Sequence, residues 1–246
     1  MIDIYISPAN HPKKYCIKGY NEKQQMELLA PLLKAELENK YIGAVVHLPT
    51  IFNKNQQYTG RPEEARGLGC DAYVALHSNA GGGKGACLFY HPSFALSKEM
   101  ALSIVTELNH ICPIKSNRAK QPAIYAWNKG AFNFGELRVP AKYGIVPVLI
   151  EHEFHDTAEG AAWLINSLEA IAKADARGIA KALGLRRRGD VNGDGVVDNL
   201  DAVAVLKHDA GIKELSADEL KAADANGDGV VDNSDATMIL KEDAGI

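Results

Sequence analysis

Short apolar runs alternate with longer segments of helical periodicity over the first 185 residues. The runs that predict strands lie at residues 2–6, 43–48, 73–76, 86–90 and 146–150. The segments that predict helices lie at residues 21–39, 61–69, 93–110 and 157–183. Pro31 is expected to kink or interrupt the first of these helices. Strands that alternate with helices predict an α/β domain with a mostly parallel sheet and helices on both faces.

The central strand at residues 73–76 ends in a histidine, His77, and the turn-rich sequence SNAGGG follows it. In open α/β sheets, ligands bind outside the carboxyl ends of the strands, so an imidazole at this position is expected to face a site. A histidine at a strand end can also be a satisfied core group. His77 alone therefore does not decide between the two interpretations.

Other polar residues lie at element ends that should converge on the same edge. His11 follows the first strand, Glu22 opens the first helix, and Glu151 ends the fifth strand. Two histidines and one carboxylate suit zinc with an open fourth position, and a second carboxylate suits a general base for the bound water. Taken singly, His11 can be a surface loop residue and Glu22 a complement to the helix dipole. Together they favour a metal site with one catalytic Zn²⁺.

The last part of the chain contains two copies of one motif, at residues 190–212 and 224–246. Each copy matches the D-x-[DN]-x-[DN]-G opening of a calcium loop, with a glycine at the sixth position for the sharp turn. An aspartate stands at position 12 in place of the glutamate of an EF-hand, and no helix is expected to precede either loop in the manner of an EF-hand. The expected ligands of two structural Ca²⁺ ions are Asp190, Asn192, Asp194, Val196, Asp198 and Asp201, then Asp224, Asn226, Asp228, Val230, Asp232 and Asp235.

The formal charge divides the chain at the same place. From Asp190 onward there are 14 acidic residues against 4 lysines, and the remainder carries 23 basic against 17 acidic residues. We expect domains at residues 1–185 and 190–246, joined by a linker at residues 186–189. Three consecutive arginines in this linker are interpreted as solvated, and no nucleic-acid partner is expected.

The cysteine spacing and the lengths of the apolar runs indicate neither a zinc ribbon, nor a dense disulfide framework, nor a membrane span. The four cysteines, Cys16, Cys70, Cys87 and Cys112, are scattered without a CxxC spacing and are expected to pack as small apolar groups. No apolar run approaches the roughly 18 residues of a membrane span, and the chain starts in a predicted strand without signal-peptide features. If the protein is secreted, its signal is not present in this sequence.

Residues 190–246 resemble a dockerin, the paired calcium module that attaches cellulosomal enzymes to cohesins on a scaffold protein. The helix after each loop is expected to bury Ala202, Val205 and Leu206 in the first copy, and Ala236, Ile239 and Leu240 in the second. A second stripe is expected to face the cohesin, and it comprises Asn199, Leu200, Val203, Lys207, Asn233, Ser234, Thr237 and Lys241. Its first copy is more apolar, so one binding orientation is expected to dominate.

The segments NEK at residues 21–23, ALHSNAGG at 75–82 and PVLIEHEF at 147–154 resemble the zinc-dependent N-acetylmuramoyl-L-alanine amidases of the Amidase_3 type. The resemblance implies that Glu22 and His77 are zinc ligands and that Glu151 is the catalytic base. The family's D-P-G-H-G-G loop is replaced by SPANH, which places His11 one residue late as the third ligand. His155 is an alternative metal or substrate contact, and His152 is expected to pack or to face solvent.

The two resemblances together imply an extracellular or cell-surface, cellulosome-attached enzyme that cuts the amide between N-acetylmuramic acid and L-alanine in peptidoglycan. The net positive catalytic part would favour a polyanionic wall. Trp127, Tyr125 and Phe132 are candidates for a substrate groove, with core packing as the alternative. Two other functions stay open at this point: a non-catalytic wall-binding or structural module of a cellulosome, and a zinc peptidase.

Overall fold

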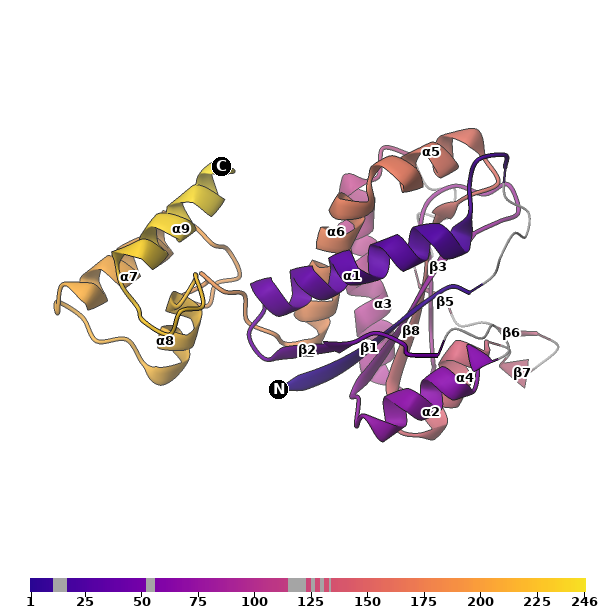
Figure 1. Cartoon of the computed structure of the whole chain (residues 1–246), viewed down its shortest axis with the longest axis horizontal. Helices are drawn as coiled ribbons and strands as arrows, with labels where there is room; N and C mark the ends of the chain where they lie inside the picture. Colours follow the sequence, from indigo (N-terminus) through magenta and orange to yellow (C-terminus); the bar gives the residue numbers. More distant parts are fainter. Residues whose placement is uncertain (11–16, 52–55, 115–122, 125–126, 129–130, 133) are drawn as a thin grey trace. The chain divides into compact units, whose positions relative to one another are not determined.

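The computed structural model of the chain describes residues 1–10, 17–51, 56–114, 123–124, 127–128, 131–132 and 134–246. This part of the chain divides into two compact units (Figure 1). One unit combines residues 1–37 with residues 44–183, and the other combines residues 38–43 with residues 184–246. Each unit is described by itself below.

The first unit is built on a six-stranded sheet with the strand order β2-β1-β3-β8-β4-β5. These strands are β1 (Ile2–Pro8), β2 (Ala44–His47), β3 (Ala72–Asn79), β4 (Cys87–Tyr90), β5 (Ala123–Ile124) and β8 (Val146–Phe154). All neighbouring pairs are parallel except β4 with β8, which is antiparallel. The predicted mostly parallel sheet is confirmed, with one reversed pair.

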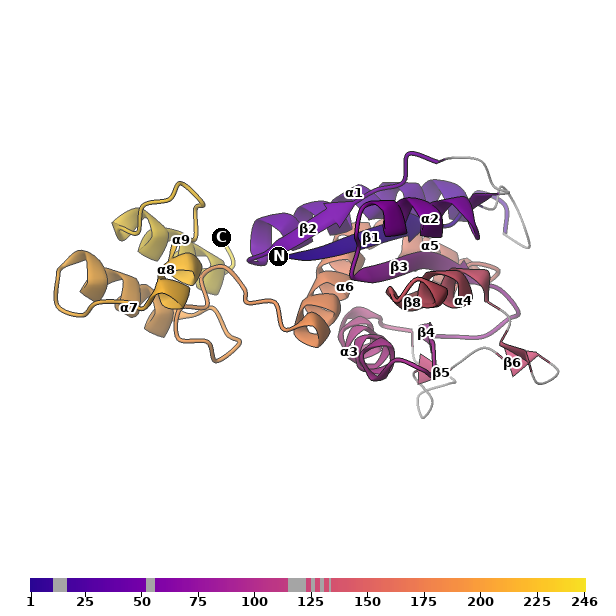
Figure 2. The same cartoon turned by 90° about the horizontal axis from the view of Figure 1, so that it is seen from below.

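One face of the sheet is covered by α2 (Gly60–Gly67) and α4 (Gly135–Lys142). Tyr5 of β1 and Tyr73 of β3 stack here with ring centroids 5.3 Å apart, and Leu137 of α4 joins their cluster. Alternate residues of a strand point to opposite faces, so the odd-numbered core residues of β1 and β3 belong to this face. Figure 2 shows both helices in front of the strands. The sequence pattern did not predict α4.

The opposite face carries α1 (Glu22–Lys40), α3 (Ala95–Ile111), α5 (Ala158–Asn166) and α6 (Leu168–Leu183) (Figures 1 and 2). The α1 helix runs through Pro31 without interruption, which corrects the expectation of a break. Its buried Met26, Leu29, Leu33 and Leu37 recur every three or four residues. Their burial contributes about 1.5–3 kcal/mol each and outweighs the roughly 3 kcal/mol that an internal proline costs.

The α3 and α6 helices pack at close range over this face. A Cβ added at Gly178 of α6 would lie 2.4 Å from the Cα of Ile104 in α3. Glycine is therefore required at this crossing for steric reasons. The segment predicted as one helix at residues 157–183 consists of two helices, because the backbone of Ser167 leaves the helical conformation between them.

The described part of the chain also contains a small antiparallel pair, β6 (Trp127–Asn128) with β7 (Ala131–Phe132). Tyr125 lies outside the described residues, so the proposed groove of aromatic side chains stays a prediction. Of the cysteines, Cys70 and Cys87 are buried as expected, Cys112 is partly buried, and Cys16 lies outside the described residues. No helix in the described part is long and apolar enough to span a membrane.

The second unit is helical, with α7 (Asn199–Asp209), α8 (Ala217–Ala223) and α9 (Asn233–Ala244). Val191, Val205, Leu215 and Ile239 form its core with Val197 and three alanines. Two expectations were wrong here. The α8 helix directly precedes the second loop, and Leu206 and Leu240 are 43% and 44% exposed. Each of these leucines lies about 100° around the helix from the last core residue, which carries it to the edge of the buried face.

Candidate active site

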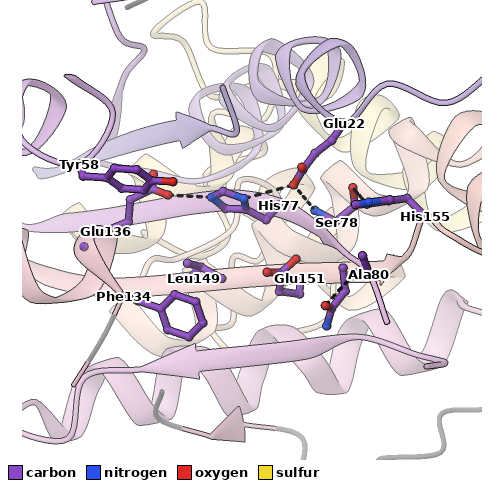
Figure 3. A pocket seen from close by; sticks show the side chains of 12 residues that line it. Glu22, Tyr58, His77, Ser78, Ala80, Phe134, Glu136, Leu149, Glu151 and His155 are labelled. Atoms are coloured by element: carbon purple, nitrogen blue, oxygen red, sulfur yellow. Dashed lines mark hydrogen bonds and ion pairs between the residues drawn. The ribbon is translucent and has the colours of Figure 1, made fainter. Parts of the chain in front are cut away.

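The site lies at the carboxyl ends of β3 and β8, where a cavity of about 330 Å³ opens (Figure 3). The side chains that define its polar wall come from six different elements or loops. They belong to Glu22, Tyr58, His77, Ser78, Glu136, Glu151 and His155. Phe134 and Leu149 add an apolar side. The cavity is therefore a mixed pocket in which several ionisable groups meet with apolar surface.

Glu22 and His77 are brought together, as expected from their places in the sequence. Glu22 is the first residue of α1, and its Oε1 lies 3.2 Å from Nδ1 of His77 and accepts a hydrogen bond of 3.1 Å from the backbone N–H of Ser78. Both side chains are almost completely buried. Burial would raise the pKa of Glu22, but the contact with His77 holds that pKa below its usual value.

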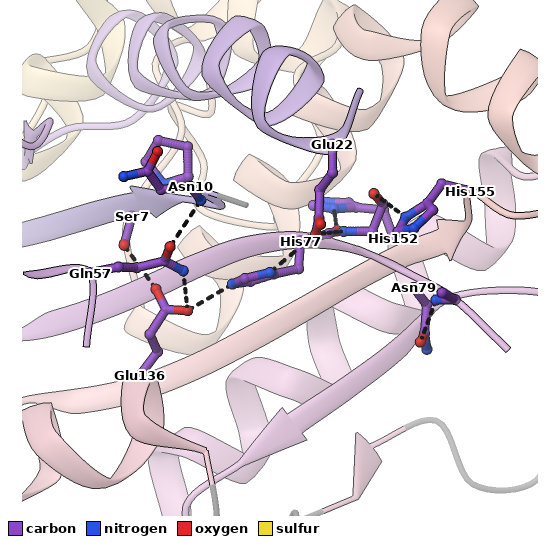
Figure 4. A network of polar contacts seen from close by, with 12 residues as sticks. Ser7, Asn10, Glu22, Gln57, His77, Asn79, Glu136, His152 and His155 are labelled. Carbon is purple, nitrogen blue, oxygen red and sulfur yellow. Dashed lines mark hydrogen bonds and ion pairs between the residues drawn. The ribbon is translucent and has the colours of Figure 1, made fainter. Parts of the chain in front are cut away.

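The other ring nitrogen of His77 contacts a residue that the sequence analysis missed. Nε2 of His77 lies 2.7 Å from Oε2 of Glu136, which is 1% exposed and belongs to α4. Burial alone would lower the pKa of His77, but the carboxylates of Glu136 and Glu22 hold it well above its usual range. The imidazole therefore lies between two carboxylates (Figure 4).

Glu136 is held by further donors. Its Oε1 accepts a hydrogen bond of 2.9 Å from Oγ of Ser7, and its Oε2 accepts one of 2.8 Å from Nε2 of Gln57. Oε1 of Gln57 in turn accepts a hydrogen bond from the backbone N–H of Asn10 (Figure 4). This buried network fixes the carboxylate that faces His77.

Glu151 lies opposite His77 in the parallel register of β3 and β8. Its carboxylate lines the cavity, and its Oε2 is buried without a hydrogen-bond partner among the described residues (Figure 3). Burial raises the pKa of Glu151 to about 7; His77 opposes this rise and Glu22 adds to it. A buried carboxylate oxygen that lacks a partner is costly to a fold and is typical of a functional group.

His155 lines the cavity beside Ser78. Its Nδ1 lies 2.9 Å from Oγ of Ser78, which accepts a hydrogen bond from the Tyr20 hydroxyl at 2.8 Å. The His155 ring stacks on Tyr20 with ring centroids 5.3 Å apart. The side chain is thus fixed at one end of the pocket, where it can contact a ligand.

His152 is completely buried, so the expectation that it packs is correct and the solvent-facing alternative is wrong. Its Nδ1 lies 2.8 Å from the backbone oxygen of His77, and its Nε2 lies 2.8 Å from Oδ2 of Asp175 in α6. The β8 strand continues to Phe154, beyond its predicted end, and so carries His152 into the core.

The expected metal site is described only in part. His11 lies outside the described residues, and among those that are described no group of three or more His, Cys, Asp or Glu side chains is arranged to hold a metal ion. Two ligands bound to tetrahedral zinc at about 2.0–2.1 Å lie about 3.3 Å apart. The 3.2 Å between Glu22 Oε1 and His77 Nδ1 fits such a pair, and the carboxyl group of Glu151 lines the same cavity.

Comparison with known proteins bears on this geometry. The family model of N-acetylmuramoyl-L-alanine amidases, Amidase_3, matches residues 10–181. The chain belongs to this family. The amidase CwlM of Bacillus licheniformis is 27% identical over 191 residues, covering 76% of this chain and 71% of CwlM. A sporulation-specific N-acetylmuramoyl-L-alanine amidase of Bacillus subtilis (strain 168) is 26% identical over 192 residues, covering 76% of this chain and 70% of that amidase.

Solved amidase structures share the fold of this chain. The catalytic domain of CwlV from Bacillus (Paenibacillus) polymyxa var. colistinus aligns with a TM-score of 0.59 at 20% identity, covering 76% of this chain and 100% of that one. AmiC2 of Nostoc punctiforme aligns with a TM-score of 0.58 at 22% identity, covering 74% of this chain and 97% of AmiC2. The α/β architecture of the first unit is therefore an amidase fold.

The amidase domain is followed by a second match, in which residues 188–242 fit the dockerin type I domain model. Both loops of this dockerin turn as the sequence predicted, since Gly195 and Gly229 have φ angles of 90° and 86°. Asp201 accepts hydrogen bonds from the backbone N–H groups of Val191, Asn192 and Asp198. Asp235 accepts hydrogen bonds from the backbone N–H groups of Asn226 and Asp232 in the second loop. The ligand roles of these carboxylates stay predictions.

Proposed function

We propose that the chain is a zinc-dependent peptidoglycan amidase that cuts the bond between the lactyl group of N-acetylmuramic acid and L-alanine. The observation that carries the proposal is Oε2 of Glu151, which is buried without a hydrogen-bond partner among the described residues and lies in the same cavity as the Glu22–His77 pair. Membership of the amidase family supports the bond type. We assign Glu22, His77 and His11 as the zinc ligands.

In this proposal Glu151 is the general base. Zinc, when bound, supplies Lewis acidity for the scissile carbonyl and lowers the pKa of a water molecule. Oε2 of Glu151 would take a proton from the attacking water as its oxygen bonds to the scissile carbonyl carbon, and would return that proton to the amine of L-alanine as the C–N bond breaks. Burial keeps the pKa of Glu151 near 7, so the carboxylate can both accept and return a proton at neutral pH.

The remaining wall of the cavity would bind the stem peptide or the lactyl group. Ser78 and His155 offer a hydroxyl and an imidazole, and Phe134 offers an apolar surface. The first 189 residues carry a net charge of +6, which would favour approach to a polyanionic wall.

We further propose that the dockerin binds two Ca²⁺ ions and docks to a cohesin of a cellulosome scaffold, outside the cell or at its surface. The exposed stripe of α7 supports this, since Leu200 is 60% and Val203 is 42% exposed. Apolar side chains that stay exposed on a helix suit burial against a partner. The more apolar first copy supports one dominant orientation.

The test of the proposed chemistry compares the full chain with Glu151→Gln on purified peptidoglycan. We expect the zinc-loaded wild type to release new amino groups on L-alanine, and Glu151→Gln to lose at least about 100-fold in rate with its zinc content unchanged. Glu107→Gln, which removes a carboxylate paired with Arg177 outside the pocket, is the control.

Three results would contradict the proposal. Retained activity of Glu151→Gln would refute the role of that carboxylate. New amino groups on other stem residues would indicate a zinc peptidase. Wall binding by a zinc-loaded wild type that releases no amino groups would indicate a non-catalytic module of the cellulosome.

A further inference from the structure

We propose that Glu136 is a positioning residue for the metal site. Its carboxylate accepts the Nε2–H of His77, so that Nδ1 of the same ring faces the metal ion together with Glu22. This inference rests on the proposed zinc site. It assigns a function to a residue of α4 that the sequence did not single out.

The geometry of the His77 ring separates the two roles. Nδ1 lies 3.2 Å from Glu22 Oε1, a separation that suits two ligands of one zinc ion, whereas Nε2 lies 2.7 Å from Glu136 Oε2, a direct hydrogen bond. Histidines that bind metals commonly donate their other ring N–H to a carboxylate, which fixes the tautomer and makes the ligand nitrogen more basic. Glu136 has the place of that carboxylate.

Glu136 cannot readily share one ion with Glu22, because the two carboxylates lie at opposite nitrogens of the same ring (Figure 4). This arrangement also agrees with the finding that no three acidic, histidine or cysteine side chains converge within the described part of the chain. Glu136 therefore acts on the metal through His77.

The surroundings of Glu136 are built to hold its carboxylate in place. Ser7 donates to Oε1 and Gln57 donates to Oε2, at 2.9 and 2.8 Å. A guanidinium nitrogen of Arg61 donates to Ser7 Oγ at 3.1 Å and to the backbone oxygen of Pro8 at 2.6 Å. Ser7, Gln57, Arg61 and Glu136 are each no more than 1% exposed. These hydrogen bonds fix the orientation of the Glu136 carboxylate.

The experiment measures zinc affinity of the full chain by competition with a chromophoric chelator, and the absorption spectrum of the Co²⁺-substituted protein. We expect Glu136→Gln to weaken zinc binding by 10- to 100-fold, the usual effect of losing such a partner, and to shift the Co²⁺ bands. Glutamine has nearly the volume of glutamate and can still accept from His77, so the fold is expected to persist. Glu136→Ala should weaken zinc binding at least as much.

Glu107→Gln is the matched control, since it neutralises a partly buried carboxylate of α3 away from the cavity, and its zinc affinity should equal that of the wild type. This inference would be overturned if Glu136→Gln bound zinc within twofold of the wild-type affinity and left the Co²⁺ bands unshifted. That result would leave the proposed zinc site intact. A wild type that binds no zinc would overturn both.

Discussion

His152 and Asp175 form a completely buried ion pair, with 2.8 Å between Nε2 and Oδ2. The pair joins β8 to α6, and the opposite nitrogen of His152 contacts the backbone oxygen of His77. Burial would lower the pKa of His152, but Asp175 holds it above its usual value. The pair thus ties the strand end that carries His77 to the helix layer behind it.

Asp175→Ala should destabilise the amidase domain by about 3–5 kcal/mol, because it leaves a buried imidazole without its counter-ion. Urea unfolding followed by circular dichroism measures this loss. Asp218→Ala is the control, since its carboxylate is 80% exposed beside Lys221 and its loss should change stability by less than about 0.5 kcal/mol. Equal stabilities of the two variants would contradict a structural role for the buried pair.

Gly178→Ala should destabilise the same domain by about 1–3 kcal/mol, since the added methyl group would press on the backbone of Ile104. Gly67→Ala is a matched control at the end of α2, where an added Cβ meets nothing within 4 Å. Alanine there should leave stability unchanged or raise it by up to about 1 kcal/mol. Thermal unfolding of both variants decides the matter, and a fully stable Gly178→Ala would show that α3 and α6 are less tightly packed.

Glu64 gives the fold a dependence on pH. Burial would raise its pKa, but hydrogen bonds from Thr50 and from the Tyr5 hydroxyl hold that pKa below its usual value. A depressed pKa contributes stability that is present above the unfolded value of roughly 4.3 and is lost as pH falls through the folded value. Wild-type unfolding free energy should therefore fall more steeply than that of Glu64→Gln below about pH 5. Parallel curves for the two proteins would exclude this contribution.

Removal of calcium should unfold the dockerin while the amidase domain stays folded. Four aspartates per loop would repel one another when no cation is bound, so we expect the loops and the helices that follow them to depend on the ion. We expect chelation to abolish amide protection of α7 and α9 in hydrogen exchange and to leave that of β3 and β8 unchanged. Full protection of both helices in chelator would contradict two structural Ca²⁺ sites.

Much of the amidase fold follows from the sequence, since apolar runs of strand length and periodic helices recur in order. The convergence of Glu22, His77 and Glu151 also follows, because parallel strands end at one edge of the sheet. The direction of β4 does not follow from the sequence, because the apolar segment CLFY at residues 87–90 fits a parallel or an antiparallel strand equally well. Its antiparallel pairing is decided by the chain connections on either side.

Glu136 escaped the sequence analysis because nothing local marks it. It lies in the short helix GELRVPAK, which has few apolar residues and an internal proline, and a glutamate in a first helical turn is usually interpreted as a dipole complement. Its partners Ser7, Gln57 and His77 are 59 to 129 residues away in the chain.

The double use of Asp201 has a practical consequence for attachment. The Asp201 carboxylate accepts from Val191 in the first loop and also from Asp198 at the start of α7, so the proposed calcium loop and the helix with Leu200 are held by the same side chain. Whatever empties the loop would loosen the helix at the same moment. Binding to a scaffold through this helix would then be reversible on demand, and a chelator wash followed by calcium would release and recapture the enzyme.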